Sequence, residues 1–361
     1  MMVKLQLFFL LQLLYVLSVS QKTYLDSPAN LERYRLFRNW ITRSIAKNER
    51  VRAQHEGKLQ QEIPEDIPFP CNVTDGKSPI VPDSVHRLRP GDIDVIAAMG
   101  DSLTAGIGIF ATNSSEPASQ LNVAEISAMS RDMPFMAKYL ITRMKRDTRI
   151  DIKKHWKFLS LFIGANDFCS QMCVPSSPWS ILEKHRIDLI NTFRILRDNL
   201  PRTLISLIIV PNLKEYVITS KKRNLLRCYI VTTIACSCLF GLQFQDQRQE
   251  YYEVMSRWQK LQEEVANYPE FNRKDFTIIV SPGISNIKIT LPEGESSDLP
   301  YFSADCFHIS QKTHAIFANA LWNNLLQPIG NKTTTLLPVF KTFLCPTFKR
   351  PYLVTRENSQ I

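Results

Sequence analysis

The chain has 361 residues, of which 44% are hydrophobic. This length fits one large α/β domain with an N-terminal extension better than it fits a single small core. The formal net charge of +10 comes from scattered Lys and Arg with clusters at 143–146 and 221–224, and it favours anionic partners such as acidic headgroups. A solvated basic face without a dedicated partner explains the charge equally well. Nucleic acid is disfavoured as a partner because no recognisable binding motif is present.

Residues 1–20 begin with a basic start at Lys4, continue through an apolar core and end in small residues, Ser18 and Ser20. This pattern predicts a signal peptide and hence a secreted, extracellular protein. A membrane anchor is the weaker alternative because the run is short for crossing a bilayer, where about 20 apolar residues are needed. No second apolar run of that length occurs, so we expect no membrane-spanning segment in the mature chain.

Sequons and cysteines agree with export. The Asn-x-Ser/Thr sequons, which predict a glycoprotein, are Asn72, Asn113 and Asn331. The eight cysteines predict disulfides rather than zinc, because no CxxC pair with a matching second pair is present. Cys169 with Cys173, or Cys236 and Cys238 with distant partners, are candidate pairs, and the sequence leaves the connectivity open.

Residues 21–90 are expected to form an N-terminal helical arm and a Pro-rich linker. A charged, helix-like pattern covers residues 27–62, and three prolines in EIPEDIPFPCN then break it. We expect this arm to pack on or tether to the main domain, residues 91–335. A C-terminal tail, residues 336–361, follows.

Within the main domain, strands and helices alternate. Nearly continuous apolar runs, typical of strands covered on both faces, are 93–99, 158–164, 203–210 and 276–281. Amphipathic patterns predict helices at about 131–146, 179–198 and 246–266, and a last helix after Ser310, which suits the N-cap. This alternation favours an α/β fold, a three-layer α/β/α sandwich with a mainly parallel sheet. Sites in such sheets lie at the carboxyl ends of the strands.

Three polar clusters fall where that rule places a site. They are residues 100–102 after the first strand, 164–167 after the second, and 305–308 before the last helix. Acyl transfer needs a nucleophile, a base, a group that orients the base and donors for the oxyanion. We predict Ser102 as the nucleophile, His308 as the base and Asp305 as the orienting carboxylate, because the spacing of three lets Asp305 reach one ring nitrogen while the other faces the serine.

The remaining polar residues of these clusters have predicted roles as well. The side-chain amide of Asn166 and the backbone N–H of Ser102 are expected to hold the oxyanion. Asp101 and Asp167 are expected to shape their turns through backbone hydrogen bonds. Taken alone, Ser102 would be interpreted as an ordinary turn serine, and it is the set of three clusters that favours catalysis.

Longer segments around these clusters carry a resemblance. VHRLRPGDIDVIAAMGDSLTAG, WKFLSLFIGANDFC and FSADCFHISQKTHAIFANALWNNLLQPIG resemble the three main blocks of the phospholipase B branch of the GDSL (SGNH) lipase and esterase family. The similarity covers nearly all of the mature chain, including NVAEISAMSRDMPFMA and CPTFKRPYLV. It implies a flavodoxin-like α/β/α serine hydrolase without metal or cofactor that releases fatty acids from phospholipids or lysophospholipids. By position, Ser102 resembles the nucleophile, Asn166 an oxyanion-hole residue, and Asp305 and His308 the other triad members.

The sequence departs from the family pattern at two places. The family has a glycine in its second block whose N–H helps to form the oxyanion hole, and Ser127 stands at the matching position. A serine keeps the N–H but lacks glycine's freedom at positive φ, so we expect a less well directed donor; losing one such donor costs roughly 10² to 10³ in rate. The segment 107–120 is shorter than in relatives, so part of the substrate-binding wall is expected to be missing.

Two classes of function therefore stand open. The first is a secreted serine esterase that meets phospholipid or lysophospholipid at a membrane or micelle surface and forms an acyl-enzyme on Ser102. The second is a catalytically impaired secreted relative that acts as a lipid-binding or interaction protein. Residues 106–111 also satisfy the GxGxxA form of a dinucleotide loop, but the first glycine lies too far beyond the strand, so we discount it. The sequence leaves the oligomeric state open.

Overall fold

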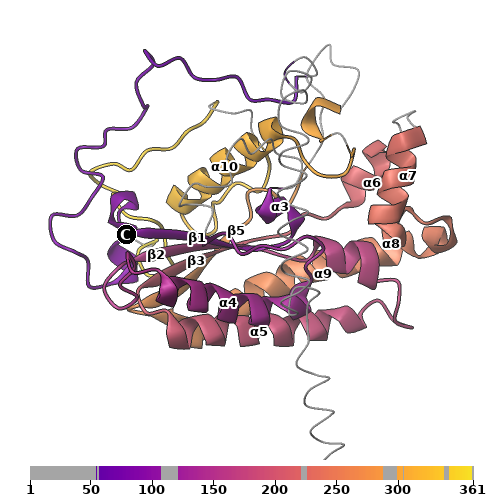
Figure 1. Cartoon of the computed structure of the whole chain (residues 1–361), viewed down its shortest axis with the longest axis horizontal. Coiled ribbons are helices and arrows are strands. Elements are labelled where there is room, and N and C mark those ends of the chain that lie inside the picture. The colour runs from indigo at the N-terminus through magenta and orange to yellow at the C-terminus, as the bar shows by residue number, and fades with distance from the viewer. Residues whose placement is uncertain are drawn as a thin grey trace, which may run out of the picture.

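The computed structural model describes residues 54, 57–106, 121–220, 226–287, 299–303, 305–336 and 341–359. A five-stranded sheet lies at the centre with helices on both faces (Figure 1). Its strands are β1 (Val95–Gly100), β2 (Lys157–Phe162), β3 (Thr203–Ile208), β4 (Asn272–Arg273) and β5 (Phe276–Ser281). β1, β2, β3 and β5 run parallel in that order, and the short β4 pairs antiparallel with β5. The predicted α/β/α sandwich with a mainly parallel sheet is confirmed.

Long amphipathic helices cover one face of the sheet (Figure 1). They are α4 (Met133–Arg146), α5 (Ser180–Asn199) and α9 (Arg248–Ala266), each close to its predicted bounds. The stripe of α4 that helical spacing selects, Met133, Met136, Leu140 and Met144, is fully buried. Together with alternate residues of the strands, these stripes form the largest hydrophobic core of the described residues.

The opposite face is covered by α10 (Gln311–Leu326). Ser310 caps this helix as predicted, because its side chain accepts the backbone N–H of Thr313. A smaller core lies under α10 at the amino ends of the strands and includes Trp156, Leu204 and Ile279. The remaining described helices are α3 (Ser102–Ala105), α6 (Lys214–Ser220), α7 (Leu226–Ala235) and α8 (Ser237–Phe240), besides single helical turns such as Asp167–Gln171 after β2. Among the described helices, none has the length and apolarity to span a bilayer.

Residues 121–125 form a strand-like segment that the sequence did not reveal. Asn122 pairs with Ala98 of β1 in a parallel bridge, and the Glu125 N–H donates to the Gly100 carbonyl at 3.0 Å. Counted after β1, this segment gives the spatial order 2-1-3-4-5 of the flavodoxin-like fold. The order reverses at β1, and open α/β sheets bind ligands at the carboxyl end of such a reversal. The residues LNVAE lack the apolar run or alternation by which strands are predicted.

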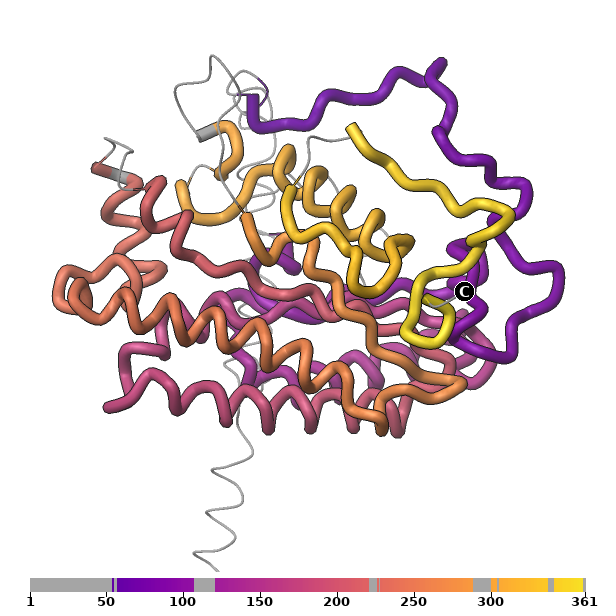
Figure 2. The backbone as a smooth tube through the Cα atoms, turned by 180° about the vertical axis from the view of Figure 1, so that it is seen from behind, coloured from indigo at the N-terminus to yellow at the C-terminus, as the bar shows by residue number. Residues whose placement is uncertain are grey.

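The two ends of the described chain meet on one side of the molecule. Residues 57–90 and 341–359 run along the same side in both views (Figures 1 and 2), and the disulfide Cys71–Cys345 joins them. The proposed domain boundaries stay a prediction. Several sequence predictions lie outside the described residues: the signal peptide 1–20, most of the arm, the segment 107–120 with the Asn113 sequon, and the basic cluster 221–224.

A helical lobe of α6, α7 and α8 connects β3 to α9, and disulfides fasten it to the rest of the domain. The bonds are Cys169–Cys236 and Cys173–Cys238 to the turn after β2, and Cys228–Cys306 to the loop before α10. Cys236 and Cys238 have distant partners as expected, but the Cys169–Cys173 pair is wrong. These two residues lie four apart on helical backbone, where Cβ atoms are about 5–6 Å apart, farther than the roughly 4 Å that a disulfide needs.

Candidate active site

Ser102 lies at the carboxyl end of β1 because the chain turns sharply at Gly100. Gly100 has a φ of 150°, and a Cβ there would lie 2.2 Å from the Phe162 carbonyl oxygen, so a side chain would force β1 and β2 apart. Asp101 then caps α3 by accepting the Leu103 backbone N–H at 3.0 Å. Ser102 is therefore the first residue of α3, next to the last residues of the strand.

His308 contacts both of its predicted partners. Its Nε2 lies 2.9 Å from the Ser102 Oγ, and its Nδ1 lies 2.6 Å from the Asp305 Oδ2. The two oxygens thus face opposite nitrogens of one ring, as the spacing of residues 305 and 308 predicts. Such an arrangement suits transfer of the serine proton to the imidazole, with the carboxylate facing the resulting cation.

Several donors hold the Asp305 carboxylate. Its Oδ1 accepts the backbone N–H groups of Phe307 and His308, both at 2.9 Å, and the hydroxyl of Ser303. Burial raises the pKa of Asp305, but the hydrogen bond and charge of His308 together with the Ser303 hydroxyl outweigh burial and lower the pKa to about 2. The group is therefore a carboxylate at neutral pH. Sequence reasoning missed Ser303, because a serine close to an acid is too common to be a signal.

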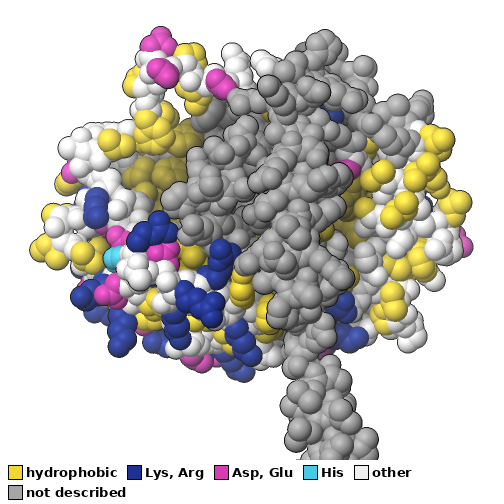
Figure 3. Space-filling view, in the orientation of Figure 1, with side chains coloured by type: hydrophobic (Ala, Val, Ile, Leu, Met, Phe, Trp, Pro, Cys, Tyr) yellow, Lys and Arg dark blue, Asp and Glu magenta, His cyan; other side chains and the backbone are white. Residues whose placement is uncertain are grey.

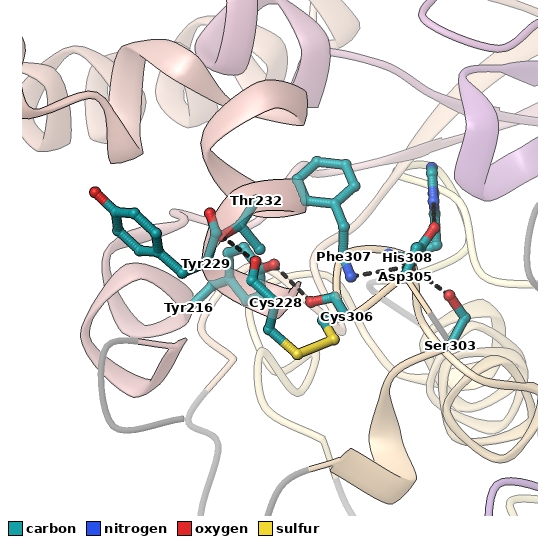
Figure 4. Close-up of a disulfide and its surroundings, with 9 residues drawn as sticks. All are labelled: Tyr216, Cys228, Tyr229, Thr232, Ser303, Asp305, Cys306, Phe307 and His308. Atoms are coloured by element: carbon teal, nitrogen blue, oxygen red, sulfur yellow. Dashed lines mark hydrogen bonds and ion pairs between the residues drawn. A yellow bond between two sulfur atoms is a disulfide. The ribbon is translucent and has the colours of Figure 1, made fainter. Parts of the chain in front are cut away.

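A disulfide and a tyrosine fasten the loop that carries Asp305 and His308 (Figure 4). Cys306 is bonded to Cys228 of α7, and its carbonyl accepts the hydroxyl of Tyr216 from α6 at 3.0 Å. Cys306 has a φ of 61°, a left-handed conformation that non-glycine residues seldom adopt. These two contacts hold the loop in a conformation that its own backbone does not favour.

Ser127 and Asn166 meet at the same end of the sheet. Residues 121–125 follow β1 as far as Gly100 and so bring Ser127 to that end. The Asn166 Nδ2 donates to the carbonyl of Ala128 at 2.9 Å. Ser127 is exposed and has a φ of 61°, so the serine adopts the left-handed conformation that a glycine would adopt. The backbone therefore gives no sign of the misdirected donor that we expected.

A buried polar network lies behind this turn. The Asp167 carboxyl accepts the Ser130 N–H at 3.1 Å, the Ser130 Oγ lies 2.7 Å from the His185 Nδ1, and the His185 ring stacks on Trp258. Burial raises the pKa of Asp167 to about 8 and lowers that of His185 to about 3, so both are mainly neutral at pH 7. The network ties the Ser127 turn to the Asn166 turn. Sequence reasoning missed it because these residues come from remote elements.

A half-open, largely apolar cavity of about 270 Å³ lies between α10 and the sheet, beside α3. Its walls include Ala98, Ser160 and Phe162 of the strands, Leu103 of α3, and Phe317 and Leu321 of α10. Ile309, the residue after His308, also lines it, so the cavity begins beside the Ser102–His308 pair. An engineered apolar cavity of roughly 150 Å³ holds benzene. By that measure, this cavity has room for a hydrocarbon chain of roughly ten carbons.

Two further ionisable residues lie beside these groups. Burial raises the pKa of Asp101 to about 7, against the Leu103 N–H and the charge of His308. Burial lowers the pKa of His314, which lines the cavity, to about 4. Among the residues that the structure describes, no three His, Cys, Asp or Glu side chains are grouped so as to hold a metal ion.

Comparisons with known proteins identify the family of this chain. Residues 96–321 match the GDSL-like Lipase/Acylhydrolase family model. The chain is similar to membrane-associated phospholipase B1 of Homo sapiens, Rattus norvegicus and Mus musculus. The identities are 32%, 33% and 33%, each over 78% of this chain. The matched part makes up only 22% of the length of each of these relatives. A solved structure titled "The structure of a putative platelet activating factor from Streptococcus pneumonia" matches over 78% of this chain and 92% of its own, at 12% identity and a TM-score of 0.29. By the family match and the identity to these relatives, the chain belongs to the GDSL-like lipase/acylhydrolase family, in its phospholipase B-like branch.

Proposed function

We propose that this protein is a serine esterase that hydrolyses acyl ester bonds of phospholipids or lysophospholipids. The observation that carries the proposal is the chain of contacts from the Asp305 Oδ2 to the His308 Nδ1, at 2.6 Å, and from the His308 Nε2 to the Ser102 Oγ, at 2.9 Å. Family membership supports the hydrolysis of esters, and the similarity to phospholipase B1 supports the lipid class of the substrate.

In the proposed reaction, His308 takes the proton of Ser102 as the Oγ attacks the ester carbonyl carbon. The ionised Asp305 faces the imidazolium that forms. The backbone N–H groups of Ser102 and Ser127 and the amide of Asn166 bind the oxyanion of the tetrahedral intermediate. His308 then gives its proton to the departing alcohol oxygen, which leaves an acyl-enzyme on Ser102. A water molecule that loses a proton to the same ring attacks the acyl carbon, the bond from that carbon to the Ser102 Oγ breaks, and His308 returns the proton to the Oγ as the fatty acid is released.

The cavity between α10 and the sheet is the proposed site of the acyl chain. Its lining is mostly apolar, and it begins at Leu103 and Ile309, the chain neighbours of Ser102 and His308. An ester carbonyl held at Ser102 therefore has room for its hydrocarbon chain within the domain. The headgroup side of the substrate then remains at the exposed end, where the enzyme meets a membrane or micelle surface.

Secretion is part of the proposal. The leader pattern of residues 1–20 supports it, and so do the four disulfides, which persist in oxidising compartments. Asn72 and Asn331 are exposed, which supports their use as glycosylation sites. A relative that binds lipid without turnover is the alternative. It was based on Ser127, whose backbone has the glycine-like conformation, and on the short segment 107–120, which lies outside the described residues.

The test is fatty-acid release from phosphatidylcholine and its lyso form by the purified secreted protein. We expect turnover by the parent protein and a loss of roughly 10⁴-fold or more in Ser102→Ala, because a triad acts as a unit. Ser180→Ala, at the exposed start of α5, is the matched control and should keep full activity. Equal release by Ser102→Ala would refute the assignment. A folded parent that binds lipid without releasing fatty acid would favour the alternative.

A further inference from the structure

The helical lobe presents an apolar face to the solvent. On α7, Leu226, Tyr229, Ile230 and Ile234 are 74%, 48%, 47% and 77% exposed, at the i, i+3, i+4 and i+8 positions of one helical stripe. Ile218 of α6 is 41% exposed as well. Figure 3 shows apolar side chains gathered on the side of the molecule where α6, α7 and α8 lie. A contiguous apolar face of this kind marks an interaction surface.

The orientation of α7 is the reverse of that of an ordinary surface helix. The side that packs against the protein carries the small residues Cys228 and Thr232, both buried. The large apolar side chains point away from the domain, and Tyr229 points away from the loop of Cys306 in Figure 4. Folding alone would favour burial of these large side chains, so their exposure suggests a second surface that covers them.

The sequence on either side of α7 indicates the chemistry of that surface. Residues 216–245 contain no Asp or Glu, but they contain Lys221, Lys222, Arg223 and Arg227. An apolar helical stripe in a stretch of sequence that carries basic and no acidic residues is typical of helices that lie in the headgroup region of anionic lipid. Charge complementarity therefore favours an anionic phospholipid surface over a second copy of this basic chain.

The lobe is also rigidly connected to the residues proposed for catalysis. The disulfide Cys228–Cys306 joins α7 to the loop that carries Asp305 and His308, and the Tyr216 hydroxyl of α6 donates to the Cys306 carbonyl at 3.0 Å (Figure 4). A surface bound by α7 is therefore held in a fixed relation to His308 and Ser102.

We propose that the apolar stripe of α7 docks this protein on anionic phospholipid surfaces. The identity of the surface as the source of substrate rests on the proposed function, but the docking itself does not. The stripe enters the headgroup region, and the Cys228–Cys306 bond then orients the loop of His308 relative to the lipid.

The first experiment measures binding without turnover. Full-length Ser102→Ala protein is sedimented with phosphatidylcholine vesicles that contain or lack phosphatidylserine. We expect binding that is stronger with phosphatidylserine. Adding Ile230→Glu and Ile234→Glu should weaken it by about tenfold or more, because two side chains then leave the apolar phase. The control, Ile187→Glu on α5, changes a side chain that is 51% exposed and should bind like its parent.

The second experiment separates docking from catalysis. In protein that keeps Ser102, the Ile230→Glu/Ile234→Glu variant should hydrolyse a water-soluble short-chain ester at the parental rate. This rate also shows that the variant folds. The same variant should release less fatty acid from vesicles than the parent. If the parent hydrolyses no ester, the proposed function fails while vesicle binding by Ser102→Ala still tests docking. Vesicle binding that the two Glu substitutions leave intact would overturn the docking proposal. The docking proposal would also be overturned if the parent protein did not bind vesicles and instead formed a dimer that these substitutions dissociate.

Discussion

At Ser127 the backbone adopts a conformation that a serine side chain disfavours. Its φ of 61° lies in the left-handed region, which costs a non-glycine residue about 1–2 kcal/mol. The turn is held from behind, because Asn166 donates to the Ala128 carbonyl and the Asp167 carboxyl accepts the Ser130 N–H. The surroundings thus impose the conformation, and the N–H of Ser127 keeps a glycine-like geometry.

Ser127→Gly is therefore expected to change stability more than rate. The free energy of unfolding should rise by about 1 kcal/mol, because glycine adopts this conformation without steric cost. Fatty-acid release should stay within a few-fold of the parental rate. Arg202→Gly, at a φ of 56° and away from the site, is the matched control and should leave the rate unchanged. A rate increase approaching 10², the value of a recovered oxyanion donor, would show instead that Ser127 misdirects its N–H.

At the scale of helices and strands, the cavity exists because the two faces of the sheet are covered by side chains of different size. Three helices pack on one face with large apolar stripes, whereas α10 covers the other, onto which the strands present small residues such as Ala98 and Ser160. Ala318 of α10 lines the cavity on its open side and is exposed. A larger side chain at this position would occupy the cavity without disturbing the packed core.

Ala318→Trp is expected to select against long acyl chains. Each buried methylene contributes about 0.8 kcal/mol, so excluding two or three of them should lower kcat/KM for long-chain esters by roughly tenfold or more. Hydrolysis of acetyl esters should change little, because their acyl groups do not extend past Leu103 and Ile309. The measurement is kcat/KM over a series of chain lengths for parent and variant. An equal effect at every chain length would place the acyl chain elsewhere.

On the scale of the whole molecule, several ionisable side chains are buried, so their pKa values differ between the folded and the unfolded chain. The pKa values of Asp101 and Asp167 are raised by burial to about 7 and about 8, whereas those of His185 and His314 are lowered by burial to about 3 and about 4. A raised acid pKa means that the folded state holds its proton longer than the unfolded chain, so stability falls as pH rises toward the folded pKa. The lowered histidine pKa values act oppositely, and stability falls as pH drops below about 6.5.

Comparison with Asp167→Asn isolates one of these groups, because asparagine resembles the protonated acid and can still accept the Ser130 N–H. The free energy of unfolding of the parent, relative to the variant, should fall as pH rises from about 4 to about 8 and level off above that. Denaturant titrations across this range measure it. Asp147→Asn is the control. Hydrogen bonds from Arg149 lower the pKa of Asp147 to about 2, so the pH dependence caused by Asp147 lies below pH 4 and the difference in unfolding free energy should stay constant between pH 4 and pH 8. A constant difference for Asp167→Asn between pH 4 and pH 8 would contradict the account.

The sequence was sufficient for features that depend on local patterns. The strand at 276–281 and the buried stripe of α4 follow from apolar runs and helical spacing, and the Asp305–His308 contact follows from a separation of three residues. The strand-like segment 121–125 had no such pattern. The Ser130–His185 contact and the partner of Cys228 depend on how remote elements pack, which no local spacing encodes.

The most direct test of the account is whether Ser102 is an activated nucleophile. The purified full-length chain would be treated with a fluorophosphonate ester, and the modified peptide identified by mass spectrometry. A serine hydroxyl displaces fluoride from such a reagent only when a base takes its proton. The account predicts one adduct, on Ser102, that is absent from the unfolded chain and strongly reduced in His308→Ala. A folded protein that forms no adduct, or one modified at another serine while Ser102 stays free, would contradict it.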